Sequence, residues 1–194
     1  MKRIFIASAM TLAFVLSGCS AEEKAETPAP FALNESAMGR YCGMNVLEHP
    51  GPKGQIILGL TNEPIWFSSA RDTLAFTMLP EEPKNIAAIY VSDMAKAPGW
   101  DEPGAENWVE ASAALYVINS SMRGGMGAQE AIPFSTRAAA EKFVAEKGGS
   151  VVGFTDIPED YVLGGGMDDE GMDEGGREMN MSLPDGNPTG NIEE

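Results

Sequence analysis

The chain has 194 residues, of which 29 are acidic and 13 are Lys or Arg, and its formal net charge is -16 at pH 7. A surface this negative repels nucleic acid and anionic lipid, so we expect no nucleic acid partner. The length suits one domain or two very small ones with a buried core. The acidity by itself does not identify a metal site, because solvated acidic faces are common.

The first 18 residues are typical of a secretory signal peptide. Lys2 and Arg3 form a positive start, and residues 4–16 form an apolar run that is too short for a stable membrane span. The run ends in Leu16-Ser17-Gly18-Cys19, which resembles a bacterial lipobox. Cleavage there would leave Cys19 as a lipidated N-terminus. We therefore expect a lipid-anchored protein on the periplasmic face of a Gram-negative membrane, with Ser20 slightly favouring the outer membrane.

Processing at Cys19 changes both charge and cysteine chemistry. Loss of Lys2 and Arg3 removes two positive charges and takes the net charge from -16 to -18. The chain has two cysteines, and lipid on Cys19 leaves Cys42 without a partner for an intramolecular disulfide. Cysteines outside the cytoplasm normally pair. Cys42 is therefore expected to be either buried and inert or used in chemistry.

Two segments outside the fold are predicted from composition. Residues 19–36 are rich in Ala, Glu and Pro, with one Lys, which predicts a flexible tether. Residues 164–194 hold nine acidic residues and one Arg, which predicts a disordered tail. That tail also holds four methionines, namely Met167, Met172, Met179 and Met181. Either they form weak copper sites beside the carboxylates, or they are merely tolerated in a solvated segment.

A sequence pattern occurs twice between these segments. An apolar stretch ends in Phe, then Ser-Ser or Ser-Thr follows, then a helical pattern with a second Phe nine residues after the first. The first occurrence begins at Pro64 and the second at Ala131. Serine and threonine oxygens accept hydrogen bonds from the free N–H groups of a first helical turn. A helix is therefore predicted after each Phe.

Strands are expected around both helices. The predicted strands are Cys42–Val46, Gln55–Leu60 and Ile86–Val91 in the first unit, and Ala113–Ile118, Ala131–Phe134 and Ser150–Phe154 in the second. This order predicts an α+β protein of two repeated ββαβ units with mostly antiparallel sheets. The expected units are residues 37–103 and 104–163.

The first unit carries soft metal ligands close together. Cys42, Met44 and His49 offer a thiol, a thioether and the only imidazole, which is a ligand set for Cu(I). On a strand, Cys42 and Met44 would share a face. The turn after His49 can fold it back toward Cys42. Lys53 would lower the thiol pKa if it lies near, although such a lysine is more often solvated.

The second unit carries one more exposed thioether. Met126 lies in a glycine-rich loop, Met122-Arg123-Gly124-Gly125-Met126-Gly127, where core packing is a weaker explanation for methionine. A structural zinc site requires four ligands, usually Cys and His, and a blue-copper site requires two His, so both fit poorly. Pairing Cys42 with Met126 would place Cu(I) between the two units.

These motifs resemble the NosL family. The resemblance rests on Cys42-Gly43-Met44, on His49-Pro50-Gly51-Pro52-Lys53-Gly54-Gln55, and on Gly125-Met126-Gly127 followed by Glu130-Ala131-Ile132-Pro133-Phe134, together with the lipobox. It covers about residues 37–158. The acidic, methionine-rich tail departs from the family pattern.

The resemblance implies a function. NosL proteins are copper-binding lipoproteins encoded with nitrous oxide reductase. The family implies a two-domain fold of repeated ββαβ units and a periplasmic Cu(I) chaperone for the copper–sulfide centre of nitrous oxide reductase. Its partners would be that enzyme, its assembly machinery and the membrane. The ligands implied by the matched motifs are Cys42 and Met126, with His49 and Met44 less firmly placed.

Two other functions are weighed against the chaperone. One is copper sequestration for tolerance, without a dedicated client. The other is a thiol enzyme, either a redox protein or a mercury–carbon lyase. Redox exchange usually uses a Cys-x-x-Cys pair, and the lyase chemistry needs a second thiol, so we expect no enzymatic activity.

Overall fold

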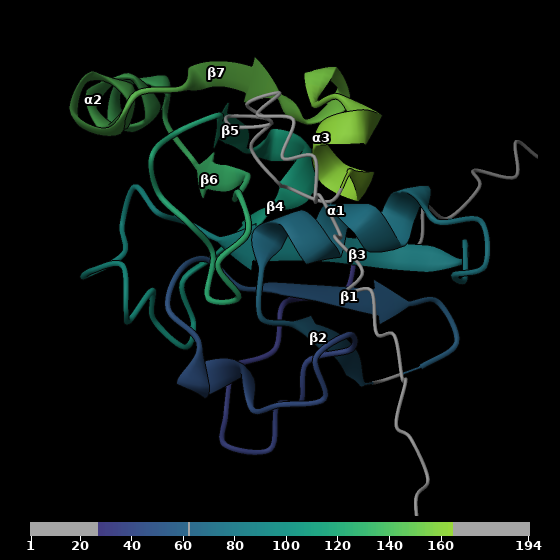
Figure 1. Cartoon of the computed structure of the whole chain (residues 1–194). Helices are drawn as coiled ribbons and strands as arrows, with labels where there is room; N and C mark the ends of the chain where they lie inside the picture. The colour runs from purple at the N-terminus through teal and green to yellow at the C-terminus, as the bar shows by residue number, and fades with distance from the viewer. Residues whose placement is uncertain (1–26, 62, 165–194) are drawn as a thin grey trace, which may run out of the picture.

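The described part of the computed structural model, residues 27–61 and 63–164, holds two antiparallel β-sheets (Figure 1). In chain order the elements are β1 (Gly54–Leu58), β2 (Pro64–Phe67), α1 (Ala70–Met78), β3 (Ile86–Ser92), β4 (Trp108–Glu110), β5 (Leu115–Ile118), β6 (Ile132–Phe134), α2 (Arg137–Lys147), β7 (Ser150–Gly153) and α3 (Glu159–Leu163). Short 3-10 turns occur at Val46–Glu48, Ala111–Ala113 and Phe154–Asp156. The α+β class with antiparallel pairing is confirmed.

The two sheets are built in the same way. The first has strand order β2-β1-β3-β4 and the second has β6-β5-β7. In each, the first strand of the unit is central, and the strands before and after the helix pair antiparallel on its two sides. β4 adds to the first sheet by pairing with β3, although it lies beyond residue 104.

Helices α1 and α2 begin where their capping residues predict. The Ser69 side chain accepts a hydrogen bond from the Asp72 N–H at 3.2 Å, and Thr136 accepts one from Ala139 at 3.4 Å. These contacts satisfy N–H groups that a first helical turn leaves free. α2 ends at Gly148, which has a φ of 73° and therefore favours glycine.

The predicted strand at Cys42–Val46 is wrong. Gly43 has a φ of 65°, so the segment bends, and the Asn45 side chain caps the following 3-10 turn by accepting from Leu47 at 2.9 Å. The second strand of the first unit is instead Pro64–Phe67, which was predicted only as the lead-in to the helix. Cys42 and Met44 therefore do not share a strand face.

Part of the expected tether packs on the fold. Leu33 is buried with Ala37 and Val46. The Gln55 side chain on β1 accepts a hydrogen bond from the Phe31 N–H at 2.8 Å and donates one to its carbonyl at 2.9 Å. Residues 27–36 thus contact the sheet, unlike a flexible tether. The signal peptide, Cys19 and the tail from residue 165 lie outside the described residues, so those expectations stay predictions.

One buried cluster contains residues of both units. Ala70, Leu74 and Val91 from the first unit belong to the same buried cluster as Tyr116 and Ala131 from the second. α1 packs on the first sheet and also contacts β6 and α3 (Figure 1). None of the described helices is long and apolar enough to cross a membrane. The start of α1 therefore lies where the segments of both units meet.

Candidate metal site

Cys42 lies on a turn beside the start of α1. Its Sγ is 3.4 Å from the Ser68 Oγ and 3.9 Å from the Met44 carbonyl oxygen. Gly39 is needed beneath it, because a Cβ at that position would lie 2.6 Å from the sulfur. Cys42 is a free, partly exposed cysteine in the described structure. The thiol is thus held in place while one side stays accessible.

His49 is buried, and its ring nitrogen lacks a partner. The residue is 8% exposed, and its Nε2 makes no hydrogen bond. Buried polar groups are nearly always satisfied, so an orphaned imidazole nitrogen calls for an explanation. Its backbone N–H closes the preceding 3-10 turn on the Val46 carbonyl at 3.4 Å. The turn thereby carries the imidazole into the interior.

The Met126 loop lies directly against His49. A Cβ on Gly125 would come within 2.5 Å of the His49 Cβ and 3.0 Å of the Pro50 carbonyl oxygen. The loop is closed by hydrogen bonds from Gly124 to Ala128 and from Gly127 to Gly124, both at 2.9 Å. Met126 itself is 54% exposed. The second unit therefore brings an accessible thioether next to the histidine turn of the first.

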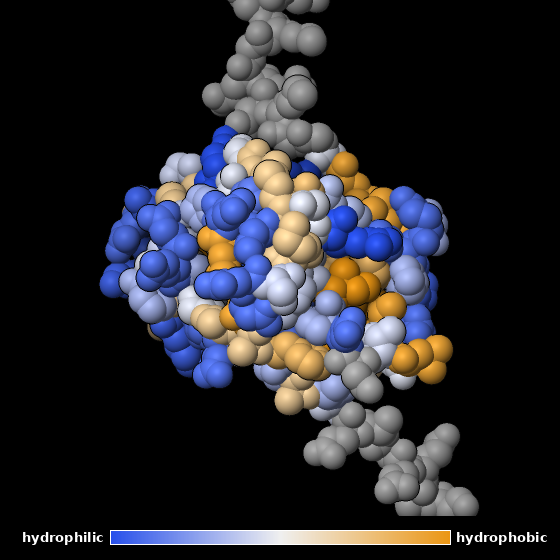
Figure 2. All heavy atoms as spheres, turned by 90° about the horizontal axis from the view of Figure 1, so that it is seen from below, coloured by the Kyte–Doolittle hydropathy of each residue, from blue (hydrophilic) through white to orange (hydrophobic). Residues whose placement is uncertain are grey.

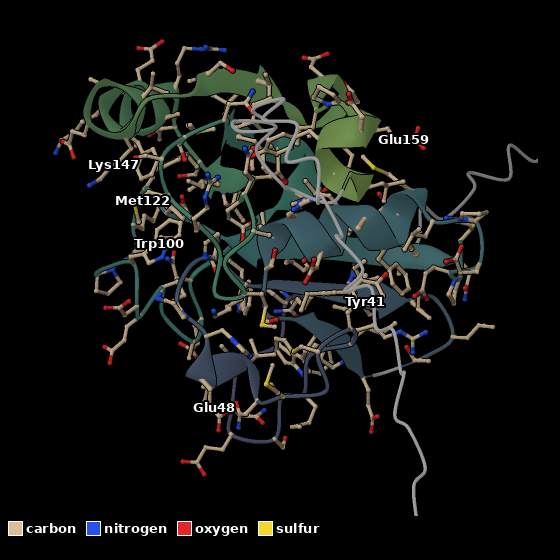
Figure 3. The ribbon with its side chains drawn as sticks, in the orientation of Figure 1. Tyr41, Glu48, Trp100, Met122, Lys147 and Glu159 are labelled. Atoms are coloured by element: carbon tan, nitrogen blue, oxygen red, sulfur yellow. The ribbon has the colours of Figure 1, made fainter. Side chains whose placement is uncertain are left out.

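Met122, at the other end of the same glycine-rich loop, has a different environment. It packs on the second-unit core beside Trp100, and Figure 3 shows the two labelled side chains as neighbours. Core packing accounts for Met122. It does not account for Met126, which is more than half exposed.

Lys53 joins the cysteine and histidine segments from inside. It is 1% exposed, and its Nζ donates to the carbonyl oxygens of His49, Pro50 at 3.2 Å and Ser68 at 3.5 Å. Burial lowers its pKa to about 8, while the charges of Glu130 and Cys42 act in the opposite direction. Lys53 is therefore buried, whereas lysines are ordinarily solvated. Lys53 fixes the His49 turn to the strand end that contacts Cys42.

Glu130 forms the corresponding buried anchor of the Met126 loop. It is 1% exposed, and its Oε1 accepts hydrogen bonds from the N–H groups of Arg71 at 2.8 Å and Ala131 at 2.9 Å. Burial raises its pKa to about 7, although the Arg71 N–H bond lowers it. Its Oε2 makes no hydrogen bond and lies beneath Gly124, whose Cβ would meet it at 2.7 Å.

The sequence alone missed this pair of anchors and the Ser68 contact. In the sequence, Glu130 is only part of the motif shared with the family, and Ser68 is only the first residue of the Ser-Ser pair before the predicted helix. Their burial depends on contacts between segments far apart in the chain, for which a local pattern carries no signal.

Hard metal sites are not supported by the described residues. Among them, no three His, Cys, Asp or Glu side chains are grouped so that they could hold a metal ion. The soft donors in this region are the Cys42 thiol and the Met126 thioether, with the His49 imidazole beside the Met126 loop. Met44 is 38% exposed, and its carbonyl, not its thioether, is the group that contacts Cys42.

Exposed apolar side chains surround Cys42 in the sequence. Tyr41 is 44% exposed and Leu47 is 47% exposed. Figure 2 views the molecule from below, with apolar side chains set among hydrophilic ones on that face.

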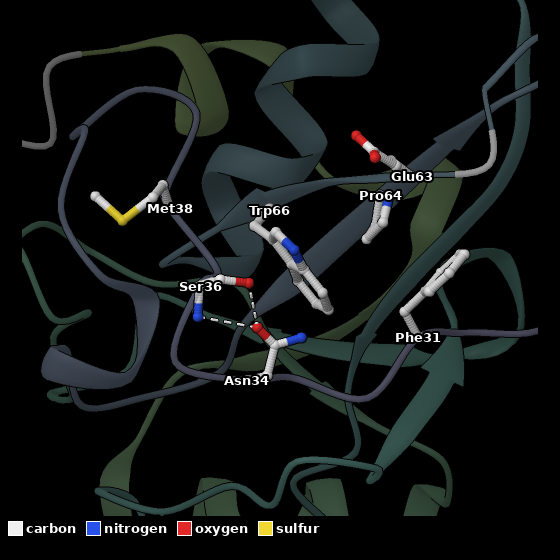
Figure 4. Close-up of a pocket in the computed structure, with 7 residues that line it drawn as sticks. All are labelled: Phe31, Asn34, Ser36, Met38, Glu63, Pro64 and Trp66. Carbon is white, nitrogen blue, oxygen red and sulfur yellow. Dashed lines mark hydrogen bonds between the residues drawn. The ribbon is translucent and has the colours of Figure 1, made fainter.

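Beside β2 lies an open groove of about 450 Å³, shown in Figure 4 and lined by Phe31, Asn34, Ser36, Met38, Glu63, Pro64 and Trp66. That lining includes neither Cys42 nor His49, so the groove is distinct from the candidate metal site.

Comparison with known proteins bears on this arrangement. A family model described as NosL matches residues 30–162. The copper-binding lipoprotein NosL of Achromobacter cycloclastes is 45% identical over 161 residues, covering 82% of this chain and 81% of the relative. The chain belongs to the NosL family.

Two other NosL proteins are also similar to this chain. The copper-binding lipoprotein NosL of Stutzerimonas stutzeri is 32% identical over 154 residues, covering 78% of each chain. The crystal structure of the copper chaperone NosL from Shewanella denitrificans matches with a TM-score of 0.63 at 31% identity, covering 69% of this chain and 98% of that one. The family resemblance inferred from the motifs is thus confirmed.

Proposed function

We propose that this protein is a lipid-anchored Cu(I) chaperone, attached through Cys19 at the periplasmic face of the membrane. It binds copper without catalysing a reaction. The relatives described above are named as copper-binding lipoproteins, and the matched crystal structure is named as a copper chaperone. The observation that carries the proposal is the buried His49 Nε2 without a hydrogen-bond partner, beside the Met126 loop.

The proposed donors are the Cys42 thiolate, the Met126 thioether and the His49 imidazole. Thiolate and thioether ligands select Cu(I) over harder ions. Met44 is a weaker candidate, because the bend at Gly43 removes the shared strand face that favoured it. In this arrangement Cys42 and His49 come from the first unit and Met126 from the second. Copper would therefore lie at the junction of the two units.

Partial exposure of the two sulfur donors fits transfer better than storage. Met126 is 54% exposed and Cys42 is partly exposed, so an incoming ligand can reach the copper. In the proposed transfer, a donor atom of the acceptor binds the copper before the bond to the Cys42 sulfur breaks. The thiolate then takes up a proton from solvent, and no free copper is released. The oxidation state of the copper does not change.

The proposed client is nitrous oxide reductase with its assembly machinery, for which copper would supply the copper–sulfide centre. Support for this client comes from the family resemblance. A cellular test compares nitrous oxide reductase purified from cells with the wild-type chain and from cells with Cys42→Ser. We expect the enzyme from the variant cells to lack the copper–sulfide absorbance. Normal absorbance there would leave sequestration as the better explanation.

A binding test addresses the ligands directly. In an anaerobic competition titration with a Cu(I) chelator, Cys42→Ser should abolish tight binding and Met126→Leu should weaken it. Met38→Leu is the matched control, because Met38 is 51% exposed and lines the groove beside β2 instead. Unchanged affinity in Cys42→Ser would refute the site.

A further inference from the structure

Ser68 places a buried hydroxyl against the sulfur of Cys42. The residue is 3% exposed, and its Oγ lies 3.4 Å from the Cys42 Sγ. A Cβ on Gly39 would lie 2.6 Å from that sulfur and 3.6 Å from the hydroxyl oxygen, so the two atoms face the same tight space. A hydroxyl oxygen is a hard donor and a poor ligand for Cu(I). The hydroxyl is therefore placed to contact the sulfur, not to bind the metal.

Backbone contacts bring Ser68 and Cys42 together. The Arg40 N–H donates to the Trp66 carbonyl oxygen at 2.8 Å, which holds the Cys42 turn against β2. Cys42 follows Arg40 by two positions, and Ser68 follows Trp66 by two. The Ser68 carbonyl oxygen also accepts a hydrogen bond from the buried Lys53 ammonium at 3.5 Å. Both partners are thus held by contacts that do not involve a metal.

Copper binding would leave only one direction for the hydrogen bond between the sulfur and the hydroxyl. A thiol and a hydroxyl can each donate or accept, so either atom can be the donor in the copper-free protein. Cu(I) replaces the thiol proton, which passes to solvent, and the resulting thiolate only accepts. The Met44 carbonyl oxygen, 3.9 Å from the sulfur, cannot donate, and it keeps the Gly39 N–H as its partner at 2.9 Å. Of these two described neighbours, the Ser68 hydroxyl is the one that can donate to a thiolate.

We propose that Ser68 is a positioning residue that donates a hydrogen bond to the copper-bound thiolate of Cys42. This inference rests on the proposed function. The bond holds the sulfur in one orientation on its turn and compensates its negative charge, since a hydrogen bond to an ionised group is roughly twice as strong as a neutral one. Hydrogen-bond partners of metal ligands typically contribute about tenfold to a hundredfold to metal affinity. Ser68 thus raises Cu(I) affinity without becoming a ligand.

Ser68→Ala tests this role, because it removes the donor and only one oxygen atom. In anaerobic chelator competition with the full mature chain, we expect it to weaken Cu(I) binding about tenfold. The ultraviolet charge-transfer band from the thiolate to Cu(I) should also move to longer wavelength. The reason is that loss of the hydrogen bond raises the energy of the sulfur lone pair. A residue with only a structural role would not move this band.

Two further variants serve as the rescue and the control. Ser68→Thr keeps the hydroxyl, so its affinity and its band should match the wild type. Thr77→Val removes a hydroxyl near the other end of α1, where it donates to the Leu74 carbonyl at 2.7 Å, and it should also match. Wild-type affinity or a wild-type band in Ser68→Ala overturns the proposal, as does a Ser68→Thr variant that behaves like Ser68→Ala. Loss of the copper-free fold in Ser68→Ala, measured by circular dichroism, overturns it as well, because the hydroxyl would then be structural.

Cys42→Ser separates this inference from the proposed function. Its charge-transfer band and its tight Cu(I) binding should both disappear. That loss, together with wild-type behaviour of Ser68→Ala, refutes only the role of Ser68. Unchanged Cu(I) binding in Cys42→Ser refutes the proposed site itself, and the role of Ser68 with it.

Discussion

The buried carboxyl of Glu130 should make the stability of the fold depend on pH. Its side chain is 1% exposed, and only Oε1 is hydrogen-bonded, to the N–H groups of Arg71 and Ala131. Burial raises its pKa from the ordinary 4.5 to about 7. Glu130→Gln retains a carbonyl oxygen for the two N–H donors and removes the ionisable group, so it isolates the effect of the charge.

The sign and size of the pH-dependent change in unfolding free energy follow from the raised pKa of Glu130. A carboxyl protonated more readily in the folded state stabilises the fold fully below pH 4.5, and this contribution is lost as pH rises through about 7. At 1.36 kcal/mol per pH unit, the loss is about 3 kcal/mol. The glutamine variant should not show it. Relative to the wild type, Glu130→Gln should therefore gain about 3 kcal/mol of unfolding free energy between pH 4.5 and pH 8.

Urea unfolding at pH 4.5, 6 and 8 measures this difference. Glu146→Gln is the control, because Glu146 is exposed on α2 and the same substitution there should leave the pH profile unchanged. A difference between Glu130→Gln and wild type that stays constant with pH would refute the argument that burial of an ionisable carboxyl controls this part of the profile.

Two further substitutions test the contacts that hold the site. Gly125→Ala places a Cβ 2.5 Å from His49, which should cost about 1–3 kcal/mol and push the loop outward. Cu(I) affinity should then fall about tenfold for each 1.4 kcal/mol by which the displaced loop weakens the copper-binding free energy. Gly99→Ala is the control, because a Cβ at Gly99 has no atom within 4 Å, and it should leave the affinity unchanged. Lys53→Met leaves the carbonyl oxygens of His49 and Ser68 without their donor, so urea unfolding should show a loss of at least about 2 kcal/mol. Wild-type stability of Lys53→Met would contradict the bridging role of the ammonium.

The helices and the second sheet could be predicted because their signals are local. Ser69 and Thr136 cap their own helices, and Gly148 ends α2 through its own positive φ. The apolar strands β5 and β6 follow from short runs of adjacent residues. Such features depend on contacts within a few positions, so the sequence pattern contains them.

The error at Cys42–Val46 has a local cause as well. The segment has the apolar and polar residues of a strand, but Gly43 adopts a left-handed conformation and Asn45 satisfies the N–H of a short helical turn. Glycine and asparagine are typical turn residues, and that signal outweighs the strand pattern. Met44 lost its predicted position beside Cys42 for this reason.

Other features depend on distant segments and could not be predicted from a local pattern. Residues 27–36 pack on the fold because a side chain on β1, Gln55, pairs with the backbone of Phe31. Lys53 and Glu130 are buried because other segments supply their hydrogen-bond partners. The identities of the soft donors were apparent from the sequence, but the contact that joins them, Gly125 against His49, is a property of the folded chain.

X-ray absorption of the Cu(I)-loaded full mature chain tests the central claim most directly. We expect a copper ion with sulfur neighbours and one imidazole nitrogen, and the loss of one sulfur neighbour in Met126→Leu. In His49→Gln the imidazole signal should disappear. A copper environment without sulfur, or a spectrum unchanged by both substitutions, would contradict a site assembled from the two units.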